Sequence, residues 1–263
     1  MRYTWQYILD NRYDKNRSAV RKMNERYVVM SAITKALAPA PTYVLLNFGV
    51  HPDTATLMSF IFIILAVVLF FFGQPILAIS SMLLFAFLDS VDGDMARCLG
   101  PTKYGAVFDS FGADLFYALM PVGVGYYLFS IGVVILGLSP TKILLVSVFV
   151  SLSFILYRLI NTKVLHFRNS LKEDNQNHSQ VAKKVLDSAG LVRLLELYRH
   201  VLVRGNFFSE PGMIFWFSVL ILVRRYDVLA GYLIVLLLYN LGYLATNFVG
   251  TYVFFKSFKP STK

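Results

Sequence analysis

Charged side chains are missing from two long stretches of this 263-residue chain. Residues 54–88 and residues 115–141 contain no Asp, Glu, Lys or Arg. A helix of about 20 apolar residues is long enough to cross the hydrocarbon core of a bilayer. Apolar residues make up 57% of the chain, whereas in soluble domains the share is about half even when glycine is counted. The sequence therefore predicts an integral membrane protein and argues against a soluble globular domain.

Cysteine and acidic residues are also scarce. Cys98 is the only cysteine, so no intramolecular disulfide can form and the fold requires no oxidising compartment. The 25 Lys and Arg residues outnumber the 15 acids and give a formal net charge of +10. Because the basic residues lie outside the apolar stretches, this excess fits anionic lipid headgroups and argues against a nucleic-acid partner. Residues 1–36 hold eight basic and three acidic residues, and we expect this end to stay in the cytoplasm without a cleaved signal peptide.

Six membrane-spanning helices are expected in an all-α fold. The predicted spans cover residues 51–73, 75–89, 104–129, 143–160, 207–223 and 228–255. Before them, residues 17–48 carry apolar residues at helical spacing among charged ones, which predicts an amphipathic interfacial helix rather than a span. Six spans place both termini on the cytoplasmic side. They leave Arg224 and Arg225 on the opposite side, against the positive-inside tendency.

This topology divides the chain into four regions. They are a cytoplasmic N-terminal region at 1–50, four spans at 51–160, a cytoplasmic insertion at 161–210, and two spans with a basic tail at 211–263. The insertion has eight basic residues, five acids and three of the four histidines, which makes it too polar to span. Its apolar residues recur at helical spacing, so we expect an amphipathic helix that either lies on the membrane or packs on the core.

Five aspartates between the apolar stretches form the main candidate for a functional site. They are Asp89, Asp92, Asp94, Asp109 and Asp114. A charge at membrane depth costs at least about 2.5 kcal/mol, so an acidic cluster in this setting indicates function. Asp89 and Asp92 lie three residues apart at a helix end and can share one ligand. Carboxylates from two helices without His or Cys favour a hard cation such as Mg²⁺, Mn²⁺ or Ca²⁺.

Residues beside these acids indicate a phosphate ligand. Gly93 removes a side chain where a ligand can approach the backbone, and Arg97 offers a planar donor fork that suits phosphate. A cation and such an arginine at the cytoplasmic membrane boundary indicate phosphoryl transfer, in which a further carboxylate takes the proton of an attacking hydroxyl. The alternative is that the acids form packing salt bridges with Arg97, Lys103, Arg158 or N-terminal bases, although the acids outnumber the nearby bases.

The stretch resembles the signature of the CDP-alcohol phosphotransferase family, D-x2-D-G-x2-A-R-x7 or 8-G-x3-D-x3-D. The matching residues are Asp89, Asp92, Gly93, Ala96, Arg97, Gly105 and Asp109. Counted from Gly105, the last aspartate of the signature falls on Ala113, and the nearest acid is Asp114. The longer spacing instead fits Asp114 and departs at Ala106 and Ser110. Helical residues five apart diverge by about 140°, so we expect a local irregularity such as a π-bulge at 109–114.

The resemblance implies a multi-pass membrane enzyme with its active site at the cytoplasmic face, acting as a homodimer. It would transfer a substituted phosphate group from a CDP-linked donor to an alcohol acceptor and release CMP, as in phospholipid or related head-group biosynthesis. The implied ligands of two Mg²⁺ or Mn²⁺ ions are Asp89, Asp92, Asp109 and Asp114, with Asp114 also the catalytic base. The implied CDP contacts are Asp53, Thr56, Asp89, Gly93, Ala96, Arg97 and Thr102, of which Asp53 and Thr56 belong to an opening similar to the family's P-N-x-x-T.

Three further residues have expected places. Lys103 and Arg158 are candidates for contact with the acceptor or a phosphate, and Arg158 fits a snorkelling arginine at a helix end equally well. Asp94 falls at a variable position of the signature and is expected to face solvent. Two other functions stay open: a cation-coupled secondary transporter, disfavoured because the acids fall at helix ends and no repeated halves are evident, and a catalytically altered or inactive family member acting as a scaffold. The sequence identifies neither the donor alcohol nor the acceptor.

Overall fold

The computed structural model describes residues 3–11, 29–100, 105–174 and 208–257. All regular secondary structure in these residues is helical, as predicted. The helices are α1 (Trp5–Asn11), α3 (Val29–Leu37), α4 (Pro39–Asn47), α5 (Pro52–Phe71), α6 (Pro75–Leu99), α7 (Gly105–Ser130), α8 (Pro140–Asp174), α11 (Glu210–Leu222) and α12 (Tyr226–Ser257).

Proline and glycine set the ends of the long helices. Pro52, Pro75 and Pro140 each stand at the first position of a helix, where proline leaves no intrahelical hydrogen bond unmade. The His51 side chain caps α5 by accepting from the Asp53 amide at 3.4 Å, which confirms the predicted helix start. Gly73 has φ of +68°, a conformation that glycine adopts without strain, and it lets α5 reverse directly into α6.

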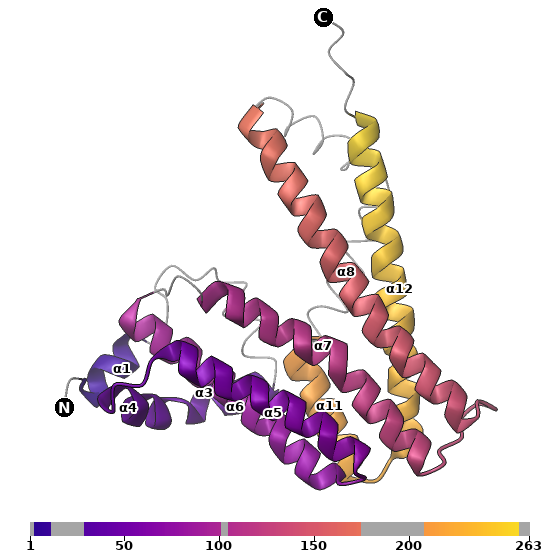
Figure 1. The fold of residues 1–263 in the computed structure, drawn as a ribbon, viewed down its shortest axis with the longest axis horizontal. Helices are drawn as coiled ribbons and strands as arrows, with labels where there is room; N and C mark the ends of the chain where they lie inside the picture. The colour runs from indigo at the N-terminus through magenta and orange to yellow at the C-terminus, as the bar shows by residue number, and fades with distance from the viewer. Residues whose placement is uncertain (1–2, 12–28, 101–104, 175–207, 258–263) are drawn as a thin grey trace, which may run out of the picture.

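The helices form one bundle whose connections alternate between its two ends. Helix α5 packs against α6 and α7, α7 packs against α8, and α8 packs against α12. Figure 1 shows that the α5–α6, α7–α8 and α11–α12 connections gather at one end of the bundle, so the end of α6 and the start of α7 lie at the other. Helices α1, α3 and α4 pack around this second end of α6. The acidic stretch therefore lies at a bundle end, as the sequence indicates.

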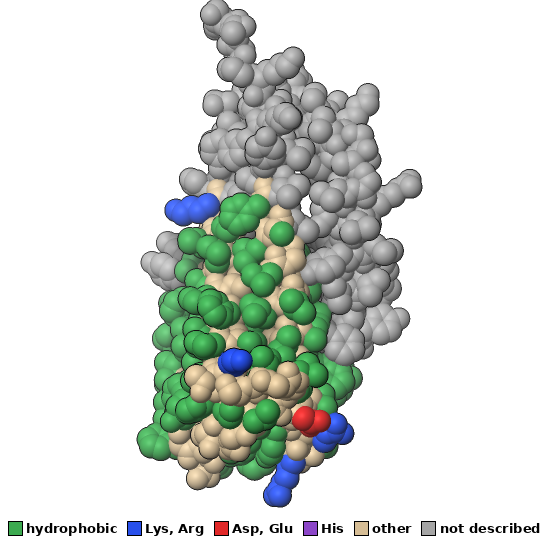
Figure 2. Space-filling view, turned by 90° about the vertical axis from the view of Figure 1, so that its right-hand side faces the viewer, with side chains coloured by type: hydrophobic (Ala, Val, Ile, Leu, Met, Phe, Trp, Pro, Cys, Tyr) green, Lys and Arg blue, Asp and Glu red, His purple; other side chains and the backbone are tan. Residues whose placement is uncertain are grey.

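The interior and the outer surface of the bundle are both apolar. Phe70, Phe85, Phe116 and Phe217 are fully buried among the helices. Large hydrophobic side chains also cover the outside, and Figure 2 shows one face on which charged side chains are few. An apolar exterior of this extent suits contact with lipid rather than with water. The chain is accordingly a multi-pass membrane protein.

Five helical segments of the described residues are long and apolar enough to cross a membrane. They are Val29–Asn47, Pro52–Phe71, Pro75–Leu99, Pro140–Ile160 and Tyr226–Ala245. Val29–Asn47 includes α3 and α4, for which an interfacial position is expected from the sequence, and α11 is a shorter apolar helix of 13 residues. Helix α3 buries Met30 and Thr34 and exposes Val29, Ile33 and Leu37. The count of six spans and the interfacial placement stay predictions.

Residues Gly105–Ser130 of α7 are all α-helical, including positions 109–114, and Pro121 lies inside the helix. The irregularity expected at 109–114 is therefore wrong, and Gly112 serves packing instead. A Cβ on Gly112 would lie 2.8 Å from Cε1 of Phe60 in α5, and a Cβ on Gly125 would overlap the Ser147 side chain in α8. Glycine lets α7 approach both neighbours closely.

Two other predictions concern regions that the structure describes only in part. Helix α8 continues to Asp174, so the first residues of the predicted insertion extend the fourth predicted span as one helix. The amphipathic helix expected within 161–210 falls mostly on residues 175–207, outside the described ones.

Candidate active site

The second half of α6 carries the first part of the acidic stretch. Its first half is buried in the apolar core through Ile79, Met82 and Phe85. The same helix then continues through the two partly buried aspartates, Asp89 and Asp92, and ends at Leu99. This helix end presents the acids at the boundary of the apolar bundle.

Helix α5 contributes a hydroxyl to this group. The Thr56 side chain is buried and donates to Oδ2 of Asp92 at 2.6 Å, a length typical of a charge-assisted hydrogen bond. The resemblance implies Thr56 as a CDP contact, and the structure places it as the partner of Asp92. Asp53, one turn earlier, lies 3.3 Å from Nδ1 of His51. Thr56 thus fixes the orientation of one candidate metal ligand.

Arg97 is paired with Asp94 within α6. The Asp94 carboxylate is only 2% exposed and forms an ion pair with Nη2 of Arg97. The expectation that Asp94 faces solvent is therefore wrong. Position 94 shares its helix face with Val91 and Cys98, which are both buried, and its spacing of three residues from Arg97 is the signal that could have predicted the pair.

Asp114 faces helix α8. Its carboxylate forms an ion pair with Nε of Arg158, and Nη2 of Arg158 also donates to Oγ of Ser110 at 3.1 Å. Arg158 therefore binds two positions one turn apart on α7, which explains its place better than a snorkelling role alone. On the regular helix α7, position 109 lies about 140° around the axis from position 114. The fourth signature aspartate is thus directed away from the position of the third.

The group of acids fits a hard cation in its chemistry but is incomplete in the described residues. No group of three or more His, Cys, Asp or Glu that could hold a metal ion occurs among them. Asp89 and Asp92 supply carboxylate oxygens from adjacent turns of α6. A third ligand would come from Asp109, whose backbone belongs to α7 and whose side chain is not described. Thr102 and Lys103 lie outside the described residues.

The N-terminal helices support the end of α6, a feature that sequence reasoning missed. The Tyr7 hydroxyl in α1 donates to the Cys98 carbonyl at 2.9 Å, and the Ser90 hydroxyl donates to Thr34 in α3 at 2.8 Å. Both bonds join residues more than fifty positions apart, and no local sequence pattern predicts them.

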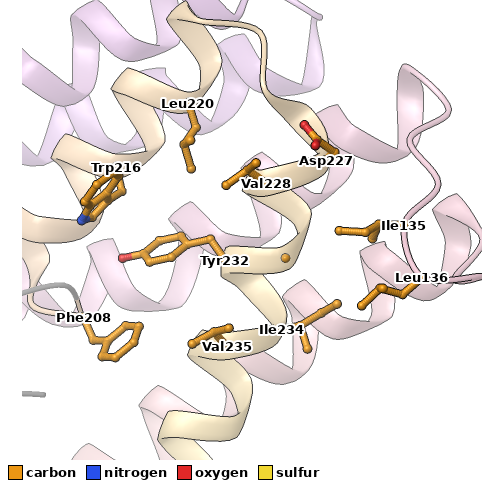
Figure 3. Close-up of a pocket in the computed structure, with 11 residues that line it drawn as sticks. Ile135, Leu136, Phe208, Trp216, Leu220, Asp227, Val228, Tyr232, Ile234 and Val235 are labelled. Carbon is orange, nitrogen blue, oxygen red and sulfur yellow. The ribbon is translucent and has the colours of Figure 1, made fainter.

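A cavity at the opposite end of the bundle is separate from these residues. It has a volume of about 560 Å³, and its walls are almost entirely apolar, with Trp216 from α11, Tyr232 from α12 and Ile135 from the α7–α8 connection (Figure 3). Asp227 lies at one edge and is paired with Arg225, which raises the pKa of the Arg225 guanidinium above its ordinary value. This cavity lacks the polar groups that a nucleotide requires.

Apolar helices with a carboxylate and arginine site at one end are the arrangement expected of a membrane-bound phosphotransferase. The chain belongs to the CDP-alcohol phosphatidyltransferase family, whose model matches residues 49–257. The matched range contains the acidic stretch from Asp89 to Asp114, and the family match confirms the resemblance. The family comprises transferases that use a CDP-alcohol, so the prediction of such an enzyme is confirmed at this level. Neither the comparison with curated proteins nor the comparison with solved structures found a match.

Proposed function

We propose that this protein transfers a substituted phosphate group from a CDP-linked donor to an alcohol acceptor at the cytoplasmic face of the membrane and releases CMP. The family match supports the donor class. The observation that carries the proposal is the hydrogen bond from Thr56 to Asp92, because it orients a signature carboxylate from a neighbouring helix at the end of α6. The proposal also includes a role in phospholipid or related head-group synthesis, a homodimeric state and six membrane spans.

The donor would bind along the end of α6. The Arg97 guanidinium, which lies against Gly93, would bind the pyrophosphate through paired N–H donors. Asp89, Asp92 and Asp109 would hold Mg²⁺ or Mn²⁺, which neutralises charge on phosphate groups during transfer. The acceptor oxygen attacks the β-phosphorus of the donor, the bond from that phosphorus to the CMP oxygen breaks, and CMP leaves.

The acceptor would bind between α7 and α8. The Asp114 carboxylate, whose side chain is 45% exposed, is the candidate to take the proton of the attacking hydroxyl. Arg158 forms an ion pair with this carboxylate in the structure, so the guanidinium must turn away before the hydroxyl can reach Asp114. An acceptor with an anionic group of its own would draw the guanidinium of Arg158 to itself, and Lys103 is a candidate to assist. This exchange makes an anionic alcohol the favoured acceptor class.

The test measures CMP release from a panel of CDP-alcohols with Mg²⁺ or Mn²⁺ in the native protein and in Asp92→Asn. Loss of a metal ligand should lower the rate by at least about 100-fold, since even partners of metal ligands typically contribute about 10- to 100-fold. Asp227→Asn is the matched control, because this acid lies at the opposite end of the bundle and should leave the rate unchanged. Absence of metal-dependent CMP formation with every donor would refute the enzyme proposal.

One observation favours a second candidate, a catalytically altered family member that binds its ligand without turnover. Helix α7 directs Asp114 to Arg158, and positions 109 and 114 lie about 140° apart around its axis, whereas the four-residue spacing of the signature would place them about 40° apart. This candidate predicts that the protein binds CDP with Mn²⁺ but forms no CMP from any donor. The same panel of donors, combined with CDP titration, separates the two functions.

A further inference from the structure

We infer that Asp94 is a positioning residue, whose buried carboxylate holds the Arg97 guanidinium in place for the phosphates of the donor. The inference rests on the proposed function and gives a role to a position that the signature leaves variable. Asp94 is expected to touch neither the donor nor a metal ion, and to act through Arg97.

The burial of Asp94 is not required by the packing around it. Its carboxylate is 2% exposed, and its neighbours on the same face, Val91 and Cys98, are apolar or weakly polar and buried. Removing a carboxylate from water is costly even when it is paired, and buried ion pairs can often be replaced by hydrophobic residues without loss of stability. A charged residue at this position is therefore better explained by what it does to its partner.

The partner is held in a defined place. Asp94 accepts from Nη2 of Arg97, and the Arg97 side chain folds back along α6 over Gly93. A Cβ on Gly93 would lie 3.4 Å from both Nη1 and Nη2, an ordinary contact distance, so the guanidinium lies directly against this turn of α6. The charge of Arg97 is thereby brought back along α6 toward the turn that carries Asp92.

Hydrogen-bonding capacity remains on Arg97 after this pair is formed. A guanidinium has five N–H donors, and Nε of Arg97 is buried with no hydrogen-bond partner among the described residues. A buried donor without an acceptor is unfavourable, and a phosphate oxygen would satisfy it once the side chain turns to expose Nε. The Arg97 side chain is 26% exposed, which leaves it accessible to such a ligand.

Electrostatics predict that the effect of removing Asp94 on donor binding depends on whether Arg97 is present. In the native protein Arg97 compensates Asp94, so removing the acid removes only the support of the arginine. Without Arg97, the buried carboxylate of Asp94 would stand uncompensated beside the donor phosphates and repel them. Removal of Asp94 should therefore harm donor binding when Arg97 is present and should cause no further loss when Arg97 is absent.

The experiment is a double-mutant cycle with Asp94→Asn, Arg97→Gln and the double variant, using CDP titration with Mn²⁺ and the KM for a CDP-alcohol that the native protein turns over. Asp94→Asn should weaken CDP binding and raise the donor KM by about tenfold, within the range of couplings measured for contacting residues. It should leave the acceptor KM unchanged. In the Arg97→Gln background, Asp94→Asn should leave CDP affinity equal or improved.

The possible outcomes separate positioning from a structural role. A structural role would lower the amount of folded, active protein, so the apparent kcat would fall while the donor KM and CDP affinity stayed constant. An equal loss of CDP affinity in both backgrounds would overturn the inference and leave the proposed function intact. A native protein that neither binds CDP nor forms CMP would remove the proposed function, and this inference with it. The double variant replaces both charges, so neither is left buried without its partner. Its thermal unfolding, compared with that of each single variant, shows whether a single variant fails because it does not fold.

Discussion

Replacing Thr56 with valine tests whether the bond from α5 to Asp92 matters for catalysis. Valine keeps the branched shape of threonine and removes the hydroxyl that donates to Oδ2 of Asp92 at 2.6 Å. Hydrogen bonds to charged groups contribute about 1.5–3 kcal/mol, which corresponds to about a 10- to 150-fold loss of kcat/KM if the bond is needed in the transition state. The expected result is a loss in this range, measured as CMP release over a series of Mn²⁺ concentrations.

Thr56→Ser is the matched control because it retains the hydroxyl and loses only the methyl group. Its kcat/KM should stay within a few-fold of the native value, while Thr56→Val should also require more Mn²⁺ for half-maximal rate, since the unsupported Asp92 is a poorer ligand. Equal activities of the native protein and Thr56→Val would refute the reasoning. Equal losses of kcat/KM in the Ser and Val variants would assign the effect to packing, because the variant that keeps the hydroxyl would then be as impaired as the variant that lacks it.

Two further predictions concern stability and are measured by thermal unfolding in detergent. Gly125→Ala should destabilise the fold by about 1–3 kcal/mol, because the added Cβ overlaps Ser147 in α8. The control is Gly123→Ala on the same helix, whose Cβ meets Phe70 at an ordinary 3.4 Å and which should be neutral or stabilising. Similar unfolding temperatures for the two variants would contradict the described contact of α7 with α8. Tyr7→Phe should lower stability by about 1 kcal/mol through loss of the bond to the Cys98 carbonyl, and an unchanged unfolding temperature would show that α1 does not support α6.

The apolar helices could be predicted well because hydropathy reports directly on long uncharged runs. The span expected at 51–73 corresponds to α5 at Pro52–Phe71. The second span is expected to end near Asp89, yet α6 continues to Leu99. Polar residues end a hydropathy signal without ending a helix, since the backbone hydrogen bonds of the helix do not depend on side-chain polarity. The acidic motif therefore forms the last turns of a helix.

The candidate site could be located from the sequence, but its pairings could not be predicted. Signature spacing identifies Asp92 and Arg97, while the bond from Thr56 to Asp92 joins residues 36 positions apart and depends on how α5 packs against α6. The variable position of Asp94 in the signature predicts exposure to solvent, whereas burial depends on the helix face and not on variability. The spacing of Asp109 and Asp114 predicts a π-bulge, whereas the ion pair of Asp114 with Arg158 depends on how α7 packs against α8.

Helix α8 also has a mechanical consequence. Its 35 residues correspond to a rod of about 50 Å, well beyond the roughly 30 Å hydrocarbon thickness of a bilayer. Arg158 lies about halfway along this rod, and Figure 1 shows that α8 projects past the start of α7. An unbroken helix transmits a tilt along its whole length, so a force on the projecting part would act as on a lever and shift Arg158 relative to Asp114. Contacts made outside the bilayer would in this way reach Asp114, the carboxylate that we propose takes the proton of the acceptor.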